Sequence, residues 1–241
     1  AIIIPSRLDA QRLPNKPLKL INNKEMILHV YDAAKKSDSG EVYVASPDQK
    51  IIEKVKSYGG NAILTAKNHN TGTDRVFEVF KKILKEAPSI IINLQGDMPN
   101  INPDSIKQLI DYMGNGKCEI ATLGSTLLAE EANNQDVVKV YTKEKIKDFS
   151  FATVSDFDRK INIDHTNFVY HHIGIYGFTK EALIKYVNLK RSKLELERNL
   201  EQMRAFENNM KIHVGFVNTK PLSVDTQKDL DKVKKIMEAN E

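Results

Sequence analysis

The sequence predicts an α/β fold in which a mostly parallel sheet is flanked by helices, with a smaller antiparallel extension. In the first half, short apolar runs alternate with segments of helical periodicity, the order typical of parallel βαβ units. In the second half, several strand-like runs follow one another without full helices, which favours antiparallel pairing. The chain has 241 residues, of which 41% are hydrophobic, enough to bury a large core.

In the first half, the apolar runs are four residues long or slightly longer and are separated by amphipathic segments. The first and last of these runs are apolar at successive positions, as expected for central parallel strands covered on both faces. The predicted strands are 1–4, 41–46, 61–66 and 89–95, and the predicted helices are 25–37, 49–59 and 75–87.

The second half is less regular, and no linker or repeat divides it from the first. We therefore predict a single domain, 1–241, with an antiparallel excursion over 136–190. The predicted strands are 119–128, 136–142, 149–157 and 169–178, and the predicted helices are 105–113, 192–209 and 226–239.

Composition excludes several classes of protein. A single cysteine, Cys118, excludes an intramolecular disulfide framework and a cysteine-built zinc site, and it fits a reducing cytoplasm. No apolar run approaches the roughly 20 residues of a membrane span, so we expect no membrane association. The net charge of +4 is too small to indicate a nucleic-acid coat protein.

The stretch IPSRLDAQRLPNKPL, 4–18, follows the first strand and is basic. Its charges include Arg7, Arg12 and Lys16. It has no glycine, so it cannot be a Walker A loop or a dinucleotide fingerprint, but its side chains can supply the charge for a polyphosphate. Ligands of open α/β sheets bind beyond the carboxyl ends of the strands, where this loop begins. The alternative is an ordinary solvated basic loop.

Two aspartates are candidate metal ligands. Asp97 follows a buried strand in NLQGDMP, at the expected sheet edge, and Mg²⁺ prefers one or two carboxylates together with phosphate oxygens. Asp225 ends a short apolar run in PLSVDTQKDL. Turn capping is the alternative for Asp97, and an N-cap of the last helix is the alternative for Asp225 or Thr226.

Six stretches together resemble one family. They are IPSRLDAQRLPNKPL, HNTGTDR, NLQGDMP, HHIGIYGF, LERNLEQMRAFE and SVDTQKDLDKV, and their order and spacing resemble those of the 3-deoxy-manno-octulosonate cytidylyltransferases. The resemblance implies a Rossmann-like nucleotidyltransferase sheet and a Mg²⁺-dependent reaction. The anomeric hydroxyl of the sugar acid Kdo would attack the α-phosphorus of CTP, giving CMP-Kdo and pyrophosphate for lipopolysaccharide biosynthesis. It also implies a cytoplasmic homodimer, with the 136–190 excursion serving dimerisation and sugar binding.

The resemblance also implies roles for individual residues. The triphosphate and its transition-state charge would be bound by the basic loop, and the metal by the two aspartates, which with Arg7 and Lys16 would form the catalytic group. Thr73 or Thr71 could equally cap the helix that follows. The implied CTP-binding residues are Arg7, Arg12, Lys16, Thr71, Gly72 and Arg75, the metal ligands are Asp97 and Asp225, and the sugar-binding residues are Gln95, His172, Tyr176, Glu201 and Gln202.

The sequence departs from the family pattern at Ser6, where alanine is usual, and at Met98, where glutamate is usual. Helix 192–209 also differs around 196–199, so 8-amino-Kdo is an alternative acceptor and a sialic acid a more remote one. A nucleic-acid-binding module is the alternative outside enzymes, but the basic loop has no interleaved aromatic residue for base stacking. A metal-dependent glycosyltransferase would usually show two carboxylates where QGDMP has one.

Overall fold

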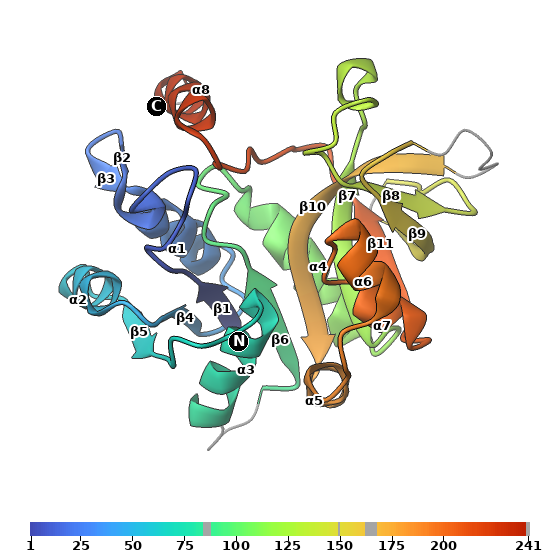
Figure 1. Ribbon diagram of the computed structural model, residues 1–241, viewed down its shortest axis with the longest axis horizontal. Helices are drawn as coiled ribbons and strands as arrows, with labels where there is room; N and C mark the ends of the chain where they lie inside the picture. Colours follow the sequence, from blue (N-terminus) through green and yellow to red (C-terminus); the bar gives the residue numbers. More distant parts are fainter. Residues whose placement is uncertain (84–87, 149, 162–167, 240–241) are drawn as a thin grey trace. The chain divides into compact units, whose positions relative to one another are not determined.

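The computed structural model describes residues 1–83, 88–148, 150–161 and 168–239 (Figure 1). The chain forms two compact units: the first contains 1–107 and 221–241, and the second contains 108–220. The single-domain interpretation is not tested by this division and stays a prediction. Among the described residues, none of the helices has both the length and the apolar character needed to cross a membrane.

The first unit is built on parallel strands, as predicted. β1 (Ile2–Pro5) pairs in parallel with β4 (Val42–Ser46) and with β6 (Ile90–Leu94), and β4 pairs in parallel with β5 (Asn61–Leu64). Isoleucines 2–4 are fully buried, which explains the unbroken apolar run. The helices packed on these strands are α1 (Met26–Lys36), α2 (Gln49–Ser57) and α3 (Gly72–Ile83).

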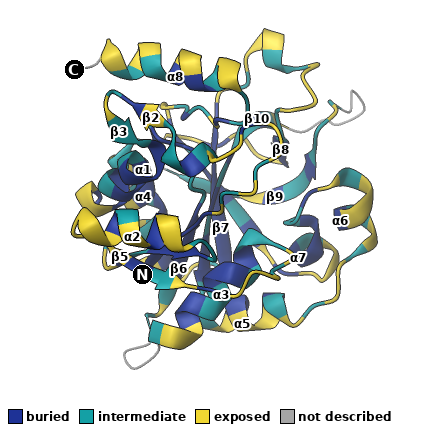
Figure 2. Cartoon of the chain, turned by 60° about the vertical axis from the view of Figure 1, so that its left-hand side comes forward, coloured by how far each residue is buried: buried dark blue, intermediate teal, exposed yellow. Residues whose placement is uncertain are grey.

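α2 turns Ile51, Ile52 and Val55 inward and leaves its other face in water, whereas α1 and α3 are exposed only at the lysines of their last turns (Figure 2). A two-stranded ribbon, β2 (Leu20–Ile21) and β3 (Lys24–Glu25), follows the 3₁₀ turn η1 (Lys16–Leu18). The chain leaves the first unit within α4 (Pro103–Gly114), and it returns to form the last helix, α8 (Gln227–Glu238).

The second unit holds the antiparallel extension. β10 (Phe168–Thr179) pairs antiparallel with β7 (Ile120–Ser125) and with β8 (Lys139–Thr142). β9 (Phe151–Asp158) pairs antiparallel with β8 and with β11 (Ile212–Phe216), and β11 runs parallel to β7. The strands β10, β7, β11, β9 and β8 are therefore paired in a closed circle, because β8 pairs again with β10. The α/β class with parallel and antiparallel strands is confirmed.

The prediction of one helix over 192–209 is wrong. The structure has two short helices, α6 (Lys193–Arg198) and α7 (Met203–Glu207), because Asn199 adopts a left-handed conformation with φ of 51° and ends the first. Asparagine tolerates that conformation better than most residues, and periodicity alone does not reveal it. The sequence analysis also missed α5 (Lys180–Val187) and β11. The end of predicted helix 75–87 lies outside the described residues.

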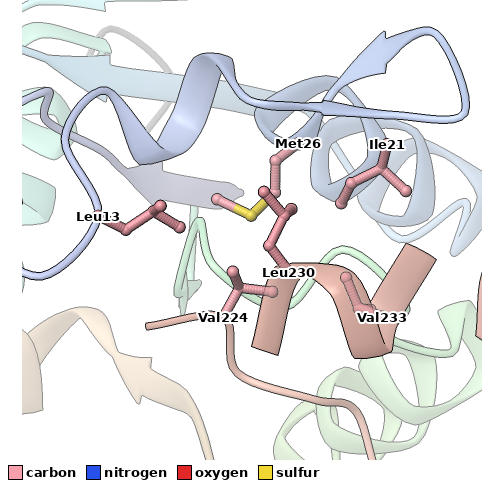
Figure 3. Packing of buried hydrophobic residues seen from close by; sticks show 6 residues of the cluster. All are labelled: Leu13, Ile21, Met26, Val224, Leu230 and Val233. Carbon is pink, nitrogen blue, oxygen red and sulfur yellow. The ribbon is translucent and has the colours of Figure 1, made fainter. Parts of the chain in front are cut away.

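A buried hydrophobic cluster joins three parts of the first unit that are distant in the sequence (Figure 3). Leu13 comes from the basic loop, Val224 from the segment before α8, and Leu230 from α8 itself. Their side chains are at most 4% exposed. Its other members are Ile21, Met26 and Val233. The cluster fixes the basic loop and the start of α8 against the same core.

We predict that Leu230→Ala lowers the free energy of unfolding by about 2–4 kcal/mol, because it opens a cavity in this cluster. Lys232→Ala, on the exposed face of the same helix, is the control and should change it by less than about 0.5 kcal/mol. Chemical denaturation monitored by circular dichroism measures both values. Equal effects of the two substitutions would contradict the account of the cluster.

Candidate functional site

The basic loop leaves β1 and is tied down along its length. The backbone N–H of Leu8 donates to Asp48 Oδ2 at 2.8 Å, and the N–H of Asn15 donates to the carbonyl of Leu8 at 3.3 Å. Asn15 takes a left-handed conformation with φ of 56°, and η1 then begins at Lys16. The loop therefore presents Arg7, which is exposed, from a backbone held at both ends.

Two backbone segments meet where the candidate aspartates lie. The N–H of Val224 donates to the carbonyl of Asp97 at 2.9 Å, and the N–H of Leu222 donates to Asn100 Oδ1 at 2.9 Å. A Cβ added at Gly96 would lie 3.2 Å from the carbonyl oxygen of Pro5, so glycine allows this segment to lie close against the end of β1. These contacts bring Asp97 near Asp225, although the two residues are 128 positions apart in the chain.

The Lys16 ammonium lies between the two aspartates. Its Nζ is 2.9 Å from Asp97 Oδ2 and 3.0 Å from Asp225 Oδ1. Arg12 Nη2 lies 3.1 Å from the other oxygen of Asp225. Burial disfavours the charged ammonium, but the two carboxylates outweigh this effect and raise the pKa of Lys16. The structure thus brings together four of the predicted site residues with balanced charge.

The structure decides against Asp225 as the N-cap of α8, because the neighbouring residue takes that role. Thr226 is the N-cap of α8, and its Oγ1 accepts a hydrogen bond from the N–H of Asp229 at 3.3 Å. The Asp229 carboxylate in turn accepts from the N–H of Thr226 at 2.8 Å, completing a capping box. The Asp225 carboxylate has no part in this cap and is directed at Lys16 and Arg12.

The candidate turn at 71–75 has a clear structural role. Thr71 Oγ1 accepts from the N–H of Asp74 at 3.2 Å, so Thr71 caps α3, which was the alternative considered from the sequence. Arg75 is 4% exposed, and its guanidinium donates to Thr65 Oγ1 and to the carbonyl of Ala66. Burial, with a further effect from the positive charge of Arg7, lowers the pKa of Arg75.

Gly72 and Gln95 are neighbours in the first unit. A Cβ on Gly72 would lie 3.6 Å from Gln95 Nε2, and Gln95 donates to Asn93 Oδ1 at 2.9 Å. Asn93 in turn donates to Thr73 Oγ1 at 3.1 Å. The Gln95 side chain is thus held beside the N-terminus of α3, at the carboxyl end of β6.

The other predicted sugar-binding residues lie in the second unit. The rings of His172 and Tyr176 are 5.4 Å apart on β10, and His172 Nε2 is 3.0 Å from Thr122 Oγ1. Burial, with a smaller effect from His171, lowers the pKa of His172 to about 3, so this imidazole is neutral at pH 7. Burial, followed by the carboxylate of Glu201, raises the pKa of Tyr176.

Glu201 and Gln202 do not lie on a long helix, contrary to the prediction. They occupy the turn between α6 and α7, where Gln202 is the residue before α7. The hydroxyl of Tyr186 donates to the carbonyl of Glu201 at 2.9 Å. Tyr186 was not among the predicted site residues, because its contact with Glu201 joins two separate elements and leaves no local pattern in the sequence.

The two departures from the family pattern are both buried. Met98 is 4% exposed, so its side chain fills the interior beside the Asp97 turn. Ser6 is 8% exposed at the end of β1, and its hydroxyl makes no hydrogen bond with the residues that the structure describes. Both differences therefore lie at buried positions and not on the exposed surface of the basic loop.

Two carboxylates are available for a divalent cation in the first unit. In the described part of the chain, no group of three or more histidine, cysteine, aspartate or glutamate side chains could hold a metal ion. Asp97 and Asp225 nevertheless direct one oxygen each at a single cation, the Lys16 ammonium. This donor set fits Mg²⁺, which takes one or two carboxylates and completes its shell with waters and phosphate oxygens.

Comparison with known proteins identifies the family. The family model described as cytidylyltransferase matches residues 1–212. The chain belongs to the cytidylyltransferase family. Two curated relatives, both named 3-deoxy-manno-octulosonate cytidylyltransferase, cover 98% of the chain: the Bartonella henselae protein is 40% identical, with 97% of its length covered, and the Thermodesulfovibrio yellowstonii protein 41% identical, with 96% covered. The resemblance and the prediction of a nucleotidyltransferase enzyme are confirmed.

A solved structure agrees with this membership. It is a CMP:2-keto-3-deoxy-manno-octonic acid synthetase complexed with CTP, with a TM-score of 0.89 and 34% identity, covering 100% of this chain and 98% of its own. A cytidylyltransferase from Leptospira borgpetersenii has a TM-score of 0.64 at 18% identity, with 99% of this chain and 86% of that chain covered. The second likeness concerns the fold alone.

We predict that Lys16→Met strengthens the binding of Mn²⁺ to the free protein by about tenfold or more, equivalent to removing roughly 1.4 kcal/mol of competition for the carboxylates. Titration followed by Mn²⁺ electron paramagnetic resonance, without nucleotide, measures this affinity. Lys19→Met removes a charge from the adjoining segment and is the control. If wild type and Lys16→Met bind Mn²⁺ equally, the ammonium does not compete for this position.

Proposed function

We propose that this protein transfers CMP from CTP to the anomeric hydroxyl of Kdo. The hydroxyl oxygen attacks the α-phosphorus, the bond from that phosphorus to the bridging oxygen breaks, and pyrophosphate leaves. Membership of the cytidylyltransferase family supports the reaction type. The names of the relatives at about 40% identity over nearly the whole chain support Kdo as the acceptor.

The observation that carries the proposal is the meeting of Lys16, Asp97 and Asp225. They come from three separate segments of the first unit, and the Lys16 Nζ lies 2.9 Å from a carboxylate oxygen of Asp97 and 3.0 Å from one of Asp225. Two carboxylates beside a basic loop are suited to a metal-bound triphosphate, because the metal offsets their repulsion from the phosphates.

The charges of Arg12, Lys16 and the two aspartates explain how this cluster could accept CTP. Without ligand, the positive charges of Arg12 and Lys16 balance the negative charges of Asp97 and Asp225. A triphosphate offers both cations new oxygen partners, so we assign Lys16 to the phosphates, together with the exposed Arg7. Release of the lysine leaves the two carboxylates directed at one position, which we assign to Mg²⁺.

The chemistry then depends on positioning and on neutralised charge. Bound Mg²⁺ would lower the repulsion between the anionic substrates and help to ionise the attacking hydroxyl. Lys16 and Arg7 would stabilise the charge that develops on the leaving pyrophosphate, and Arg12 would help to hold the triphosphate. Thr71, Gly72 and Arg75 are assigned to the nucleotide, with Thr71 acting through the N-terminus of α3.

The sugar is assigned to Gln95, His172, Tyr176, Glu201 and Gln202. Neutral His172 suits a hydrogen bond to a sugar hydroxyl better than proton transfer, because burial keeps its pKa at about 3. Glu201 supplies a carboxylate acceptor for such hydroxyls. The identity of the acceptor rests on the relatives' names, and 8-amino-Kdo is the second candidate because the family pattern differs around 196–199.

We extend the proposal to the protein's setting. The relatives support a place in lipopolysaccharide biosynthesis, since CMP-Kdo is an activated form of a sugar of that polymer. A single half-buried cysteine supports a reducing cytoplasm. The family resemblance supports a homodimer that uses the 136–190 excursion. Size-exclusion chromatography with light scattering would test the dimer, and a monomer at micromolar concentration would contradict it.

The experiment that tests the function is a pyrophosphate-release assay with CTP and Mg²⁺. Kdo, 8-amino-Kdo and N-acetylneuraminate are compared as acceptors, and we predict release with Kdo that EDTA abolishes. Asp97→Asn and Asp225→Asn should each lower kcat by more than about 100-fold, because each removes a charge from the metal position. Their circular dichroism spectra should match wild type.

Asp104→Asn, an exposed substitution at the start of α4, is the matched control and should retain wild-type turnover. A preference for 8-amino-Kdo would support the proposed CMP transfer but would replace Kdo as the acceptor. A near-normal rate for Asp97→Asn or Asp225→Asn at saturating Mg²⁺ would remove that residue from the metal position. Absence of release with all three acceptors would contradict the proposed function.

A further inference from the structure

The turn that carries Glu201 and Gln202 has little regular structure of its own. α6 ends at Asn199 in a left-handed conformation, and α7 begins at Met203. Leu200, 4% exposed, packs into the interior. A surface turn of this kind holds a side chain in one position only if neighbouring groups fix it.

A buried ion pair fixes the two ends of this turn. Arg204 on α7 donates two hydrogen bonds to Glu195 on α6, at 2.8 and 2.7 Å. Their side chains are 4% and 1% exposed, and Glu195 also accepts from Arg191 at 2.9 Å. Because both buried charges are paired and hydrogen-bonded, the pair holds α6 and α7 in one arrangement.

Tyr186, from α5, connects this pair to Glu201. Its ring centroid lies 4.9 Å from the guanidinium carbon of Arg204, a cation–π contact. Its hydroxyl donates to the carbonyl oxygen of Glu201 at 2.9 Å and lies 3.2 Å from Glu201 Oε1. The tyrosine therefore reaches the backbone and the carboxylate of the same residue. Burial, followed by the nearby Glu201 carboxylate, raises the pKa of Tyr186, so the hydroxyl keeps its proton at neutral pH.

Aromatic side chains continue from Tyr186 toward the other sugar candidates of the second unit. Phe178 lies 5.7 Å from Tyr186 and 6.3 Å from Tyr176, measured between ring centroids. Tyr176 and His172 are 5.4 Å apart, and the charge of Glu201 acts on the Tyr176 hydroxyl. Glu201 thus lies at one end of the group formed by His172 and Tyr176, and Tyr186 fixes it there.

We infer that Tyr186 is a positioning residue for acceptor binding: its hydroxyl holds the Glu201 carboxylate in the orientation that receives the sugar. This inference rests on the proposed function. Tyr186 is 2% exposed and touches no substrate; it acts through Glu201. The reason for a tyrosine here is the hydroxyl, since phenylalanine would preserve the packing and the cation–π contact.

The test compares wild type, Tyr186→Phe, Glu201→Ala and the double variant by steady-state pyrophosphate release. Tyr186→Phe should raise the KM for Kdo by about fivefold, the loss expected for one hydrogen bond to a charged group, while the KM for CTP stays unchanged. Glu201→Ala removes the carboxylate but keeps the backbone carbonyl that Tyr186 also contacts. In this background Tyr186→Phe should change the KM for Kdo by less than about 1.5-fold, because the carboxylate through which the hydroxyl acts is gone.

Tyr112→Phe is the matched control in the same unit, since it removes a half-buried phenol hydrogen bond to His213 of 2.6 Å. It should leave the KM for Kdo unchanged. If wild type uses Kdo but Tyr186→Phe leaves its KM unaltered, or raises both substrates' KM equally, the inference is overturned and the proposed function stands. If Tyr186→Phe acts equally with and without Glu201, its role is structural. If the wild-type protein does not use Kdo, the inference about Tyr186 and the proposed function are both contradicted.

Discussion

The ammonium of Lys16 between the carboxylates of Asp97 and Asp225 is the interaction on which the candidate CTP site depends. It requires three segments of the first unit to meet within hydrogen-bonding distance. The backbone hydrogen bond from the N–H of Val224 to the carbonyl of Asp97 brings Asp225, the next residue, beside Asp97. Without a cation between them, two carboxylates at this distance would repel each other, so the lysine is part of the reason the segments stay together.

Hydrophobic packing supplies the rest of the constraint. Leu13, Val224 and Leu230 place the basic loop and the start of α8 against one core. The N-cap of that helix is Thr226, which follows Asp225 in the chain and forms the capping box with Asp229. Thr226 therefore caps the helix, and the carboxylate of Asp225 is left for the candidate metal position. The charged residues of the site need not stabilise the fold by themselves, which leaves Lys16 able to exchange carboxylate partners for phosphate oxygens.

Much of the first unit could be predicted from the sequence because its signals are local. Burial on both faces gives the continuous isoleucine run of β1 and the largely apolar run of β6, and the turn Gly96-Asp97 just after β6 places a carboxylate at the sheet edge. Pairing of Asp97 with Asp225 is not a local signal. It depends on a backbone hydrogen bond between Val224 and Asp97, which are far apart in the sequence, and here the family resemblance supplied what periodicity could not.

The second unit shows where such reasoning fails. The helical pattern of 192–209 continues across Asn199, but one left-handed residue ends the helix, and so Glu201 lies in a turn. The hydrogen bond from Tyr186 to Glu201 joins α5, a helix that the sequence analysis missed, to that turn. Contacts of this kind follow from tertiary packing, which a one-dimensional pattern does not contain.

The central claim is that Asp97 and Asp225 receive a divalent cation when CTP draws Lys16 away. The most direct measurement is the anomalous difference density of Mn²⁺ in crystals of the protein with CTP. The account predicts a peak within about 2–2.3 Å of a carboxylate oxygen of each aspartate, with Lys16 Nζ on a phosphate oxygen. A peak away from both aspartates, with Lys16 still between them, would contradict it.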